Sequence, residues 1–276
     1  MTALRLDLFK TLVSLFLIFA TICHGFSSSP SFRPVRSSSR LQLFDLKSIF
    51  SSSDTDKTTA SSSVTEVDSL KGQVEELIIV TQGKAAAIHL LDPIFEQIES
   101  QNTVEAPNRD PNFKGRWHVW FTDCPPPSNG QLGPFQGSAE QDIVAQGNEY
   151  NNILRLPSNS RDDQWLTVVL DGIWEDWDGK ELSDGDDSDS STGGSFSTPL
   201  EGTDWGAKYW KVTFLRLNFS LFGNLLLSKD FPAGVARVWR STYLDDDTKI
   251  VRASRTGRPD DESVFYMKRS VRPNKN

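Results

Sequence analysis

Cysteine is scarce in this chain of 276 residues, which contains only Cys23 and Cys124. Cys23 lies in an N-terminal segment whose pattern predicts removal, so the mature chain is expected to keep Cys124 alone. A single cysteine cannot form an internal disulfide, and it cannot build a cysteine-based zinc site. The scarcity of cysteine therefore excludes folds that depend on disulfides or on zinc bound by cysteines.

Long hydrophobic runs are also absent. Residues 12–23 (LVSLFLIFATIC) form an uncharged stretch of 12 residues, whereas a membrane-spanning helix needs about 20 apolar residues. Arg5 and Lys10 precede this stretch, and the small residue Gly25 follows it, which is typical of a signal peptide. We therefore expect residues 1–25 to be a signal peptide cut after Gly25. An uncleaved anchor or a short core helix is the alternative.

Acidic residues are almost absent from residues 26–50. This segment is rich in serine and has three arginines but no acid before Asp45, a composition typical of an organellar transit peptide. A signal peptide joined to such a segment, with Phe26 at the junction, resembles the bipartite leaders of diatom and related algal plastids. The leader therefore predicts a plastid (chloroplast) protein imported through the secretory pathway. A secreted protein with a disordered serine-rich start is the alternative.

Basic residues are outnumbered, with 29 Lys and Arg against 37 Asp and Glu and a net charge of −8. Residues 1–50 carry six of the basic residues and two of the acids, so the chain without them has a net charge near −12. A surface this acidic repels phosphate backbones, which excludes general nucleic-acid binding. It also argues against non-specific adsorption to anionic lipid, which uses basic patches.

The mature chain divides by pattern into a linker, a helical region and a strand-rich region. Residues 51–69 are polar and rich in Ser, Thr and Asp, which predicts a disordered linker. Apolar residues then recur at three- and four-residue spacing over residues 70–101, which predicts helices separated at Gly83. Two prolines in residues 102–111 end the helical region. Roughly 170 foldable residues are enough for one domain with a substantial core.

Residue usage becomes typical of strands from Gly115 onward. Eight or nine short strands in one domain predict a barrel or a sandwich, and an eight-stranded barrel is just large enough for one small ligand. We expect residues 115–269 to form an antiparallel β-barrel of about eight strands. The candidate strands are residues 115–122, 139–145, 150–156, 164–170, 208–217, 219–228, 234–243, 248–254 and 262–269.

An acidic stretch interrupts the predicted strands. Residues 171–204 contain 11 acids and one lysine, and their Ser/Gly-rich centre has too little apolar surface to order itself. We therefore expect a disordered insertion over about residues 172–204. A calcium-binding or partner-binding loop is the alternative, although the spacing of a calcium loop is not matched.

Two signatures mark the first and last parts of the predicted barrel. Gly115 permits a tight entry into residues 115–122, where Trp117 and Phe121 alternate onto one face and Trp117 can plug the barrel end. Near the C-terminus, Trp239 and Tyr243 alternate onto one face before the acidic turn at residues 245–247 reverses the chain. Each signature alone is typical of ordinary sheet.

Taken in order, residues 115–122, 242–252 and 263–267 resemble the plastid lipid-associated protein family, also called fibrillins. Its members begin with helices that lead into a Gly-x-Trp strand. They end in a tyrosine-leucine-acidic-turn segment followed by isoleucine, arginine and a Ser-Val-Phe strand. The resemblance covers roughly residues 70–269 and departs from the family at residues 252–257. It implies a lipocalin-like barrel that associates with plastoglobules or thylakoid membranes and binds or organises isoprenoids and other lipids.

The predicted partners are a hydrophobic small molecule or lipid and a plastid membrane or lipid-droplet surface. An apolar lumen stabilises a hydrocarbon ligand by ~25 cal/mol per Å² of apolar surface buried. Residues 215–227 are the most apolar part of the barrel, and they predict lumen wall, lipid-facing surface or ordinary barrel core. The candidate ligand-contacting residues are Trp117, Phe121, Phe214, Phe219, Trp239 and Tyr243.

Recognisable catalytic patterns are missing. Beyond the leader the chain has two histidines, His89 and His118, and no Ser-His-Asp order, Gly-x-Ser-x-Gly motif or phosphate-binding glycine loop. We therefore expect no catalytic residue, no metal site, no cofactor and a non-catalytic lipid-associated function. A lipocalin-like enzyme acting on a plastid isoprenoid and a secreted lipocalin-like carrier are the alternatives. A coat protein that binds lipid bodies through its exterior is a further variant.

Overall fold

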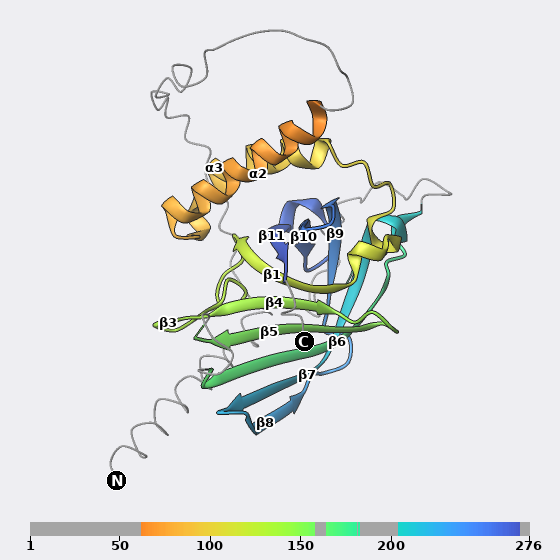
Figure 1. Cartoon of the computed structure of the whole chain (residues 1–276). Helices are drawn as coiled ribbons and strands as arrows, with labels where there is room; N and C mark the ends of the chain where they lie inside the picture. The colour runs from red at the N-terminus through yellow and green to blue at the C-terminus, as the bar shows by residue number, and fades with distance from the viewer. Residues whose placement is uncertain (1–61, 158–163, 181, 183–203, 271–276) are drawn as a thin grey trace, which may run out of the picture. The chain divides into compact units, whose positions relative to one another are not determined.

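The computed structural model contains a β-barrel, formed by one antiparallel sheet that closes on itself (Figure 1). The structure describes residues 62–157, 164–180, 182 and 204–270. Within them the sheet has nine strands in the order β6-β5-β4-β1-β11-β10-β9-β7-β8, and β6 also pairs with β7. Eight strands therefore form a closed antiparallel barrel, and β8 is an additional strand at its edge. This arrangement confirms the predicted barrel preceded by helices.

Among the described residues, two α-helices and several 3₁₀ turns precede the barrel, and the residues from Glu66 onward form one compact unit. The described elements before the first strand are α2 (Ser62–Thr81), η2 (Ala85–Ala87), α3 (Ile88–Ser100), η3 (Pro107–Arg109) and η4 (Pro111–Phe113). The predicted break at Gly83 is confirmed, because this glycine has a φ of +63° just after α2 ends.

The strands follow in sequence order, with η5 (Trp205–Ala207) before β7 and η6 (Pro259–Asp261) before β11. The strands are β1 (Gly115–Thr122), β2 (Gln131–Leu132), β3 (Phe135–Gln136), β4 (Ser138–Ile143), β5 (Glu149–Leu156), β6 (Leu166–Asp176), β7 (Tyr209–Leu221), β8 (Asn224–Asp230), β9 (Ala236–Leu244), β10 (Thr248–Ser254) and β11 (Ser263–Arg269). The predicted bounds of β1 and β10 agree with the structure. The β2–β3 hairpin was not predicted.

The prediction of a disordered linker over residues 51–69 is wrong for its last part, because α2 begins at Ser62. Val67, Leu70 and Val74 continue the helical spacing toward the N-terminus, and all three pack in one apolar cluster with the barrel. Packing of this apolar face outweighs the polar composition of the segment. Residues 51–61 and the predicted signal and transit segments lie outside the described residues.

The predicted strand ends near residues 170 and 218 are also wrong. β6 continues to Asp176 and β7 runs from Tyr209 through Asn218 to Leu221, because the two strands pair along their whole length from Leu166↔Leu221 to Asp176↔Trp210. The first part of the predicted acidic insertion is therefore strand. Residues 181 and 183–203 lie outside the described residues.

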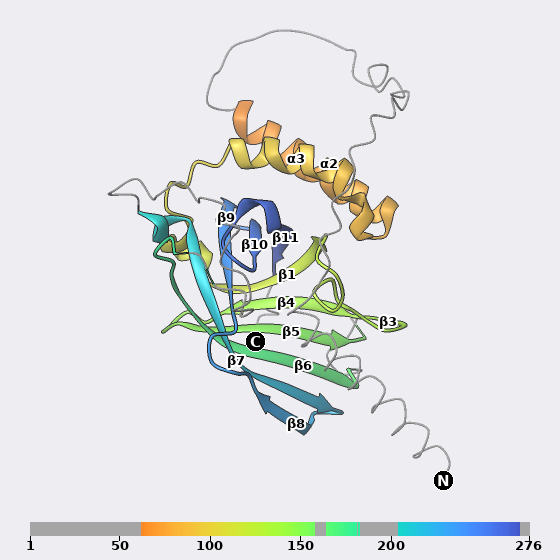
Figure 2. The same ribbon diagram turned by 180° about the vertical axis from the view of Figure 1, so that it is seen from behind.

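Strand β7 has two partners on its other side. Residues Tyr209–Thr213 pair with β9, and residues Arg216–Leu221 pair with β8. One edge of β7 therefore pairs first with β9 and then, beyond Thr213, with β8. In both views β8 lies at the free edge of the sheet (Figures 1 and 2).

Two apolar clusters hold the domain together. The helix cluster lies between the helices and one side of the barrel, and the barrel cluster lies inside the barrel. The buried members of the helix cluster are Leu70, Val74, Ile78, Ala87, Leu91, Phe95, Ile98, Phe121, Tyr243, Ile250, Val264 and Tyr266. Those of the barrel cluster are Phe113, Trp117, Ile143, Tyr150, Trp210, Val212, Phe214, Trp239, Leu244, Val251, Phe265 and Met267.

Polar contacts reinforce the helix side of the barrel. The Arg252 guanidinium on β10 donates to the Glu99 carboxylate at 2.9 and 3.0 Å and to Asp92 Oδ1 at 2.9 Å. Both acids belong to α3, and the side chains of Arg252 and Glu99 are each about 15% exposed. This bidentate pair fixes the orientation of α3 against the sheet.

The close approach of Gly137 to β5 gives a stability test. An added Cβ at Gly137 would lie 2.0 Å from the Arg155 carbonyl oxygen, whereas one at Gly72 on α2 would meet nothing within 4 Å. We expect Gly137→Ala to lower the free energy of unfolding by about 2 kcal/mol or more, because backbone must move. Gly72→Ala is the control, and it should raise stability by about 0.5–1 kcal/mol. Denaturant titration of both variants measures this, and equal stabilities would contradict the packing.

Candidate functional site

The barrel interior is filled by its own aromatic side chains. All eight barrel strands contribute to the barrel cluster, β6 through the partly buried Leu170 and Trp174. Trp117, Trp210 and Tyr150 are among the largest fully buried side chains. Trp210 stacks on Trp239 with ring centroids 5.4 Å apart. A barrel of eight strands is just wide enough for side chains to fill it in this way.

Half of the predicted ligand-contacting residues lie in this interior. Trp117, Phe214 and Trp239 belong to the barrel cluster, and each is at most 9% exposed. The Trp117 indole Nε1 donates to the Phe113 carbonyl oxygen at 3.1 Å, which ties β1 to the turn of η4. In the described structure these three rings contact neighbouring side chains and serve as core.

Phe121 and Tyr243 were expected on the same faces as Trp117 and Trp239, and this expectation is wrong. Both belong to the helix cluster. A register shift in β1 between Val119 and Phe121 reverses the alternation of that strand. A second shift, where β9 pairs with β10 at Ile250/Val251, does the same for Tyr243. Such β-bulges insert one residue into a strand and change which face the following side chains take.

Phe219, the sixth candidate, belongs to neither cluster. It lies half-buried on the part of β7 that pairs with β8, opposite Leu227 on β8 and Val168 on β6. The six candidates therefore do not form one site.

A fully buried lysine inside the barrel was missed by the sequence analysis. Lys249 on β10 is 0% exposed, and its Nζ donates to Gln141 Oε1 at 2.5 Å. The ammonium lies 4.9 Å from the ring centre of Trp117 and 5.2 Å from that of Phe113. No described carboxylate forms an ion pair with it. Aromatic faces and one amide oxygen are therefore its main stabilising contacts.

The interior is rich in hydrogen-bond donors and poor in acceptors. The indole Nε1 atoms of Trp174, Trp210 and Trp239 are buried without a hydrogen-bond partner among the described atoms. Gln141 uses its amide nitrogen to donate to Tyr150 Oη at 3.0 Å. Burial, together with the positive charge of Arg269, holds the pKa of Lys249 well below its ordinary value.

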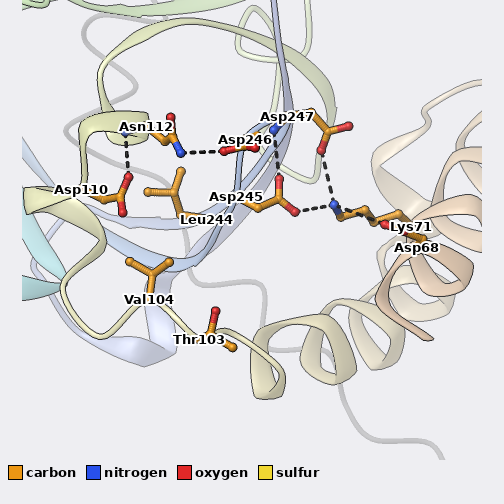
Figure 3. Close-up of a pocket in the computed structure, with 10 residues that line it drawn as sticks. All are labelled: Asp68, Lys71, Thr103, Val104, Asp110, Asn112, Leu244, Asp245, Asp246 and Asp247. Atoms are coloured by element: carbon orange, nitrogen blue, oxygen red, sulfur yellow. Dashed lines mark hydrogen bonds and ion pairs between the residues drawn. The ribbon is translucent and has the colours of Figure 1, made fainter. Parts of the chain in front are cut away.

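Outside the barrel, a pocket of about 440 Å³ lies between α2, η4 and the turn that joins β9 to β10 (Figure 3). It is polar, and five of its six charged lining residues are acidic, so it does not suit an apolar ligand. Its lining residues are Asp68, Lys71, Thr103, Val104, Asp110, Asn112, Leu244, Asp245, Asp246 and Asp247.

Ion pairs and hydrogen bonds connect the polar side chains that line this pocket. Lys71 on α2 forms ion pairs with Asp245 and Asp247, the latter at 3.3 Å. Asn112 Nδ2 donates to Asp246 Oδ1 at 2.8 Å, and Figure 3 shows these contacts converging on the turn. The acidic turn of the C-terminal signature therefore joins α2 and η4 to the barrel. Partial burial raises the pKa of Asp247, but the hydrogen bond from Thr248 and the charges of Lys71 and Lys268 outweigh it and hold this pKa below its usual range.

Large exposed apolar side chains gather on the β7–β8 hairpin. Phe222, Leu225 and Leu226 are 69%, 61% and 55% exposed, and Leu215 is 46% exposed. β8 has no buried residue. The most apolar part of the barrel, residues 215–227, which was predicted as lumen wall, lipid-facing surface or core, is therefore largely on the outside.

His118 does not belong to the barrel cluster either. It lies on β1 opposite Glu140 and Lys268, and burial lowers its pKa. Among the described residues no group of three or more His, Cys, Asp or Glu could hold a metal ion. No described helix has the length and apolar character to span a membrane.

Comparison with protein-family models and with curated proteins gives no match to this chain.

The buried charge of Lys249 predicts an unusual pH dependence. Between the lowered native pKa and about 10.4, the unfolded chain keeps a proton that the native state has released, so native stability rises with pH. Lys249→Met removes this effect. We expect the variant to be more stable than the native chain by about 1–2 kcal/mol at pH 7, with the difference shrinking as pH approaches 10. Denaturant titrations from pH 6 to 10 measure it.

The exposed Lys229→Met is the control for this prediction and should show no pH-dependent difference. A stability difference for Lys249→Met that stays constant over the pH range would contradict the lowered pKa of Lys249.

Removing the Lys71 ion pairs should weaken the attachment of α2 to the turn between β9 and β10. Lys71→Met leaves Asp245 without its lysine partner, so we expect a loss of about 1–2 kcal/mol and faster amide exchange in α2. High salt should narrow the difference from the native chain, because it screens the pairs. Lys84→Met, at an exposed position just after α2, should change neither stability nor exchange. Unchanged exchange of α2 in Lys71→Met would contradict the role of this contact.

Proposed function

We propose that this protein is a non-catalytic, lipid-associated barrel protein that binds lipid surfaces through its exterior. The observation that carries the proposal is the β7–β8 hairpin, whose exposed apolar residues extend from a barrel with an aromatic-filled interior. Soluble proteins rarely expose contiguous apolar surface without a partner for it. The resemblance to plastid lipid-associated proteins supports the same function, at plastoglobules or thylakoid membranes.

The charge of the chain favours an uncharged lipid surface. The whole chain has a net charge of −8, and the residues that follow the predicted leader are more acidic still. Anionic membranes attract proteins through clusters of Lys and Arg near the surface. The β7–β8 turn has no such cluster, since Phe222–Leu227 reads FGNLLL. Burial of apolar side chains is then the main source of affinity.

The leader supports a plastid as the compartment. Its apolar stretch, its serine-rich basic continuation and Phe26 at the junction match a bipartite import signal.

Flotation tests the proposal. A chain beginning at residue 51 contains all of the compact unit from Glu66 onward and lacks the apolar stretch of the leader, which would itself bind lipid. We expect it to float with phosphatidylcholine vesicles and triacylglycerol droplets, and to float equally at 50 and 500 mM NaCl. Protein that stays at the bottom of the gradient with both lipids overturns the proposal.

A carrier of an interior ligand is the second candidate function. The buried Lys249 and the three indole groups without acceptors favour it, because a ligand with a carbonyl or carboxylate group would supply acceptors. Lipid extraction of the purified protein followed by mass spectrometry separates the two functions. A stoichiometric ligand would favour the carrier, and its absence would favour binding through the exterior.

A further inference from the structure

One end of the barrel brings together three segments that are far apart in sequence. The ring of Phe135 on β3 contacts that of Trp165, which directly precedes β6, with centroids 5.4 Å apart in an edge-on arrangement. The backbone amide of Phe222, in the β7–β8 turn, donates to the Trp165 carbonyl oxygen at 2.8 Å. These contacts make Phe135, Trp165 and Phe222 neighbours.

Several apolar side chains at this end are open to solvent. Phe135 is 39% exposed and Phe222 is 69% exposed, and Leu225 and Leu226 continue the apolar surface along β8. The charged residues of the hairpin lie farther back, at Lys229 opposite Leu217 and at the ion pair of Arg216 with Asp230, whose N and O atoms are 2.7 Å apart. The turn itself is therefore uncharged, while charge returns toward the base of the hairpin.

Phe222 occupies a backbone position that does not favour phenylalanine. It joins Gly223 in a two-residue turn, and both have positive φ, +48° and +78°. Turns of this kind favour Asn-Gly or Asp-Gly, and a bulky residue with positive φ is uncommon. Phe222 is also largely exposed, so core packing does not explain its presence. Contact with an external apolar partner would explain why phenylalanine stands at this position.

We propose that this end of the barrel, consisting of the β2–β3 hairpin, Trp165 and the β7–β8 turn, docks on an uncharged lipid surface. Phe222 and Leu225 enter the apolar layer, and Trp165 lies at the level of the headgroups, where the amphipathic rings of Trp and Tyr are favoured. The inference rests on the proposed function and deepens it, because it assigns the surface that binds lipid and the orientation of the barrel on it.

The absence of charge from the β7–β8 turn selects the occupant. An anionic surface would repel an acidic chain, and the turn offers no lysine or arginine to offset that repulsion. A second copy of this chain, paired along the free edge of β8, is an outcome that the test must separate from lipid.

The experiment uses Phe222→Asn and the double variant with Leu225→Thr, in the chain beginning at residue 51. Asn-Gly suits the turn and threonine suits an exposed strand position, so both variants are expected to fold at least as stably as the native chain. Val80→Asn on α2 is the matched control, because Val80 is 72% exposed and belongs to a different surface. Binding to phosphatidylcholine vesicles is measured by flotation, and oligomeric state by light scattering.

We expect Phe222→Asn to weaken binding about ten-fold and the double variant about 50-fold or more, while Val80→Asn binds like the native chain. Adding 30% phosphatidylglycerol to the vesicles should not strengthen binding of the native chain. Native binding by the double variant, or stronger binding to the anionic vesicles, overturns the inference and leaves the proposed function standing. If the native chain is a dimer, and the variants are monomers with unchanged lipid binding, then this surface binds a second copy of the chain. If the native chain itself does not float with the vesicles, the proposed function is overturned instead.

Discussion

The pairing of β6 with β7 is the constraint on which the rest of the structure depends. This pairing extends along nearly the whole of both strands. It joins the two ends of the eight-stranded sheet, so that the sheet closes into a barrel. Closure forces one face of every barrel strand into a common interior, and this chain fills that interior with tryptophan, tyrosine and phenylalanine. Once the interior is occupied in this way, a lipid finds apolar surface mainly on the outside. The closed sheet and the exposed hairpin are therefore both consistent with the proposed binding of lipid through the exterior.

The same closure explains why Lys249 tolerates its position. Its alternating neighbours Thr248 and Ile250 face the helix side, so Lys249 must face inward. The aromatic rings of Trp117 and Phe113 then replace part of the hydration that the ammonium loses. Among the described residues the interior is thus a low-polarity environment around one buried amine, and ring faces and an amide oxygen contact that amine instead of a carboxylate.

The sequence predicted the barrel and the bounds of β1 and β10, because alternation and turn residues mark short strands strongly. It did not predict which face Phe121 and Tyr243 take, because a single inserted residue at a bulge reverses the alternation and leaves no trace in composition. Lys249 was missed for a related reason, since a lysine between polar and apolar strand residues is usually exposed. The start of α2 was missed because only its contacts with the barrel reveal that Val67 and Leu70 form an apolar face. β8 is exposed because the pairing of β9 with β7 ends at Thr213. No local sequence pattern predicts where this pairing ends.

The shared edge of β7 has a consequence for how this protein can change over time. Because β9 pairs with one half of β7 and β8 with the other, β8 and its turn contribute little to the closure of the barrel, and β8 has no buried residue. Substitutions in β8 and its turn should therefore accumulate without loss of folding, whereas the same substitutions in β9 would not. Related chains can accordingly acquire different surface preferences through a few changes in this one hairpin, on an otherwise constant scaffold.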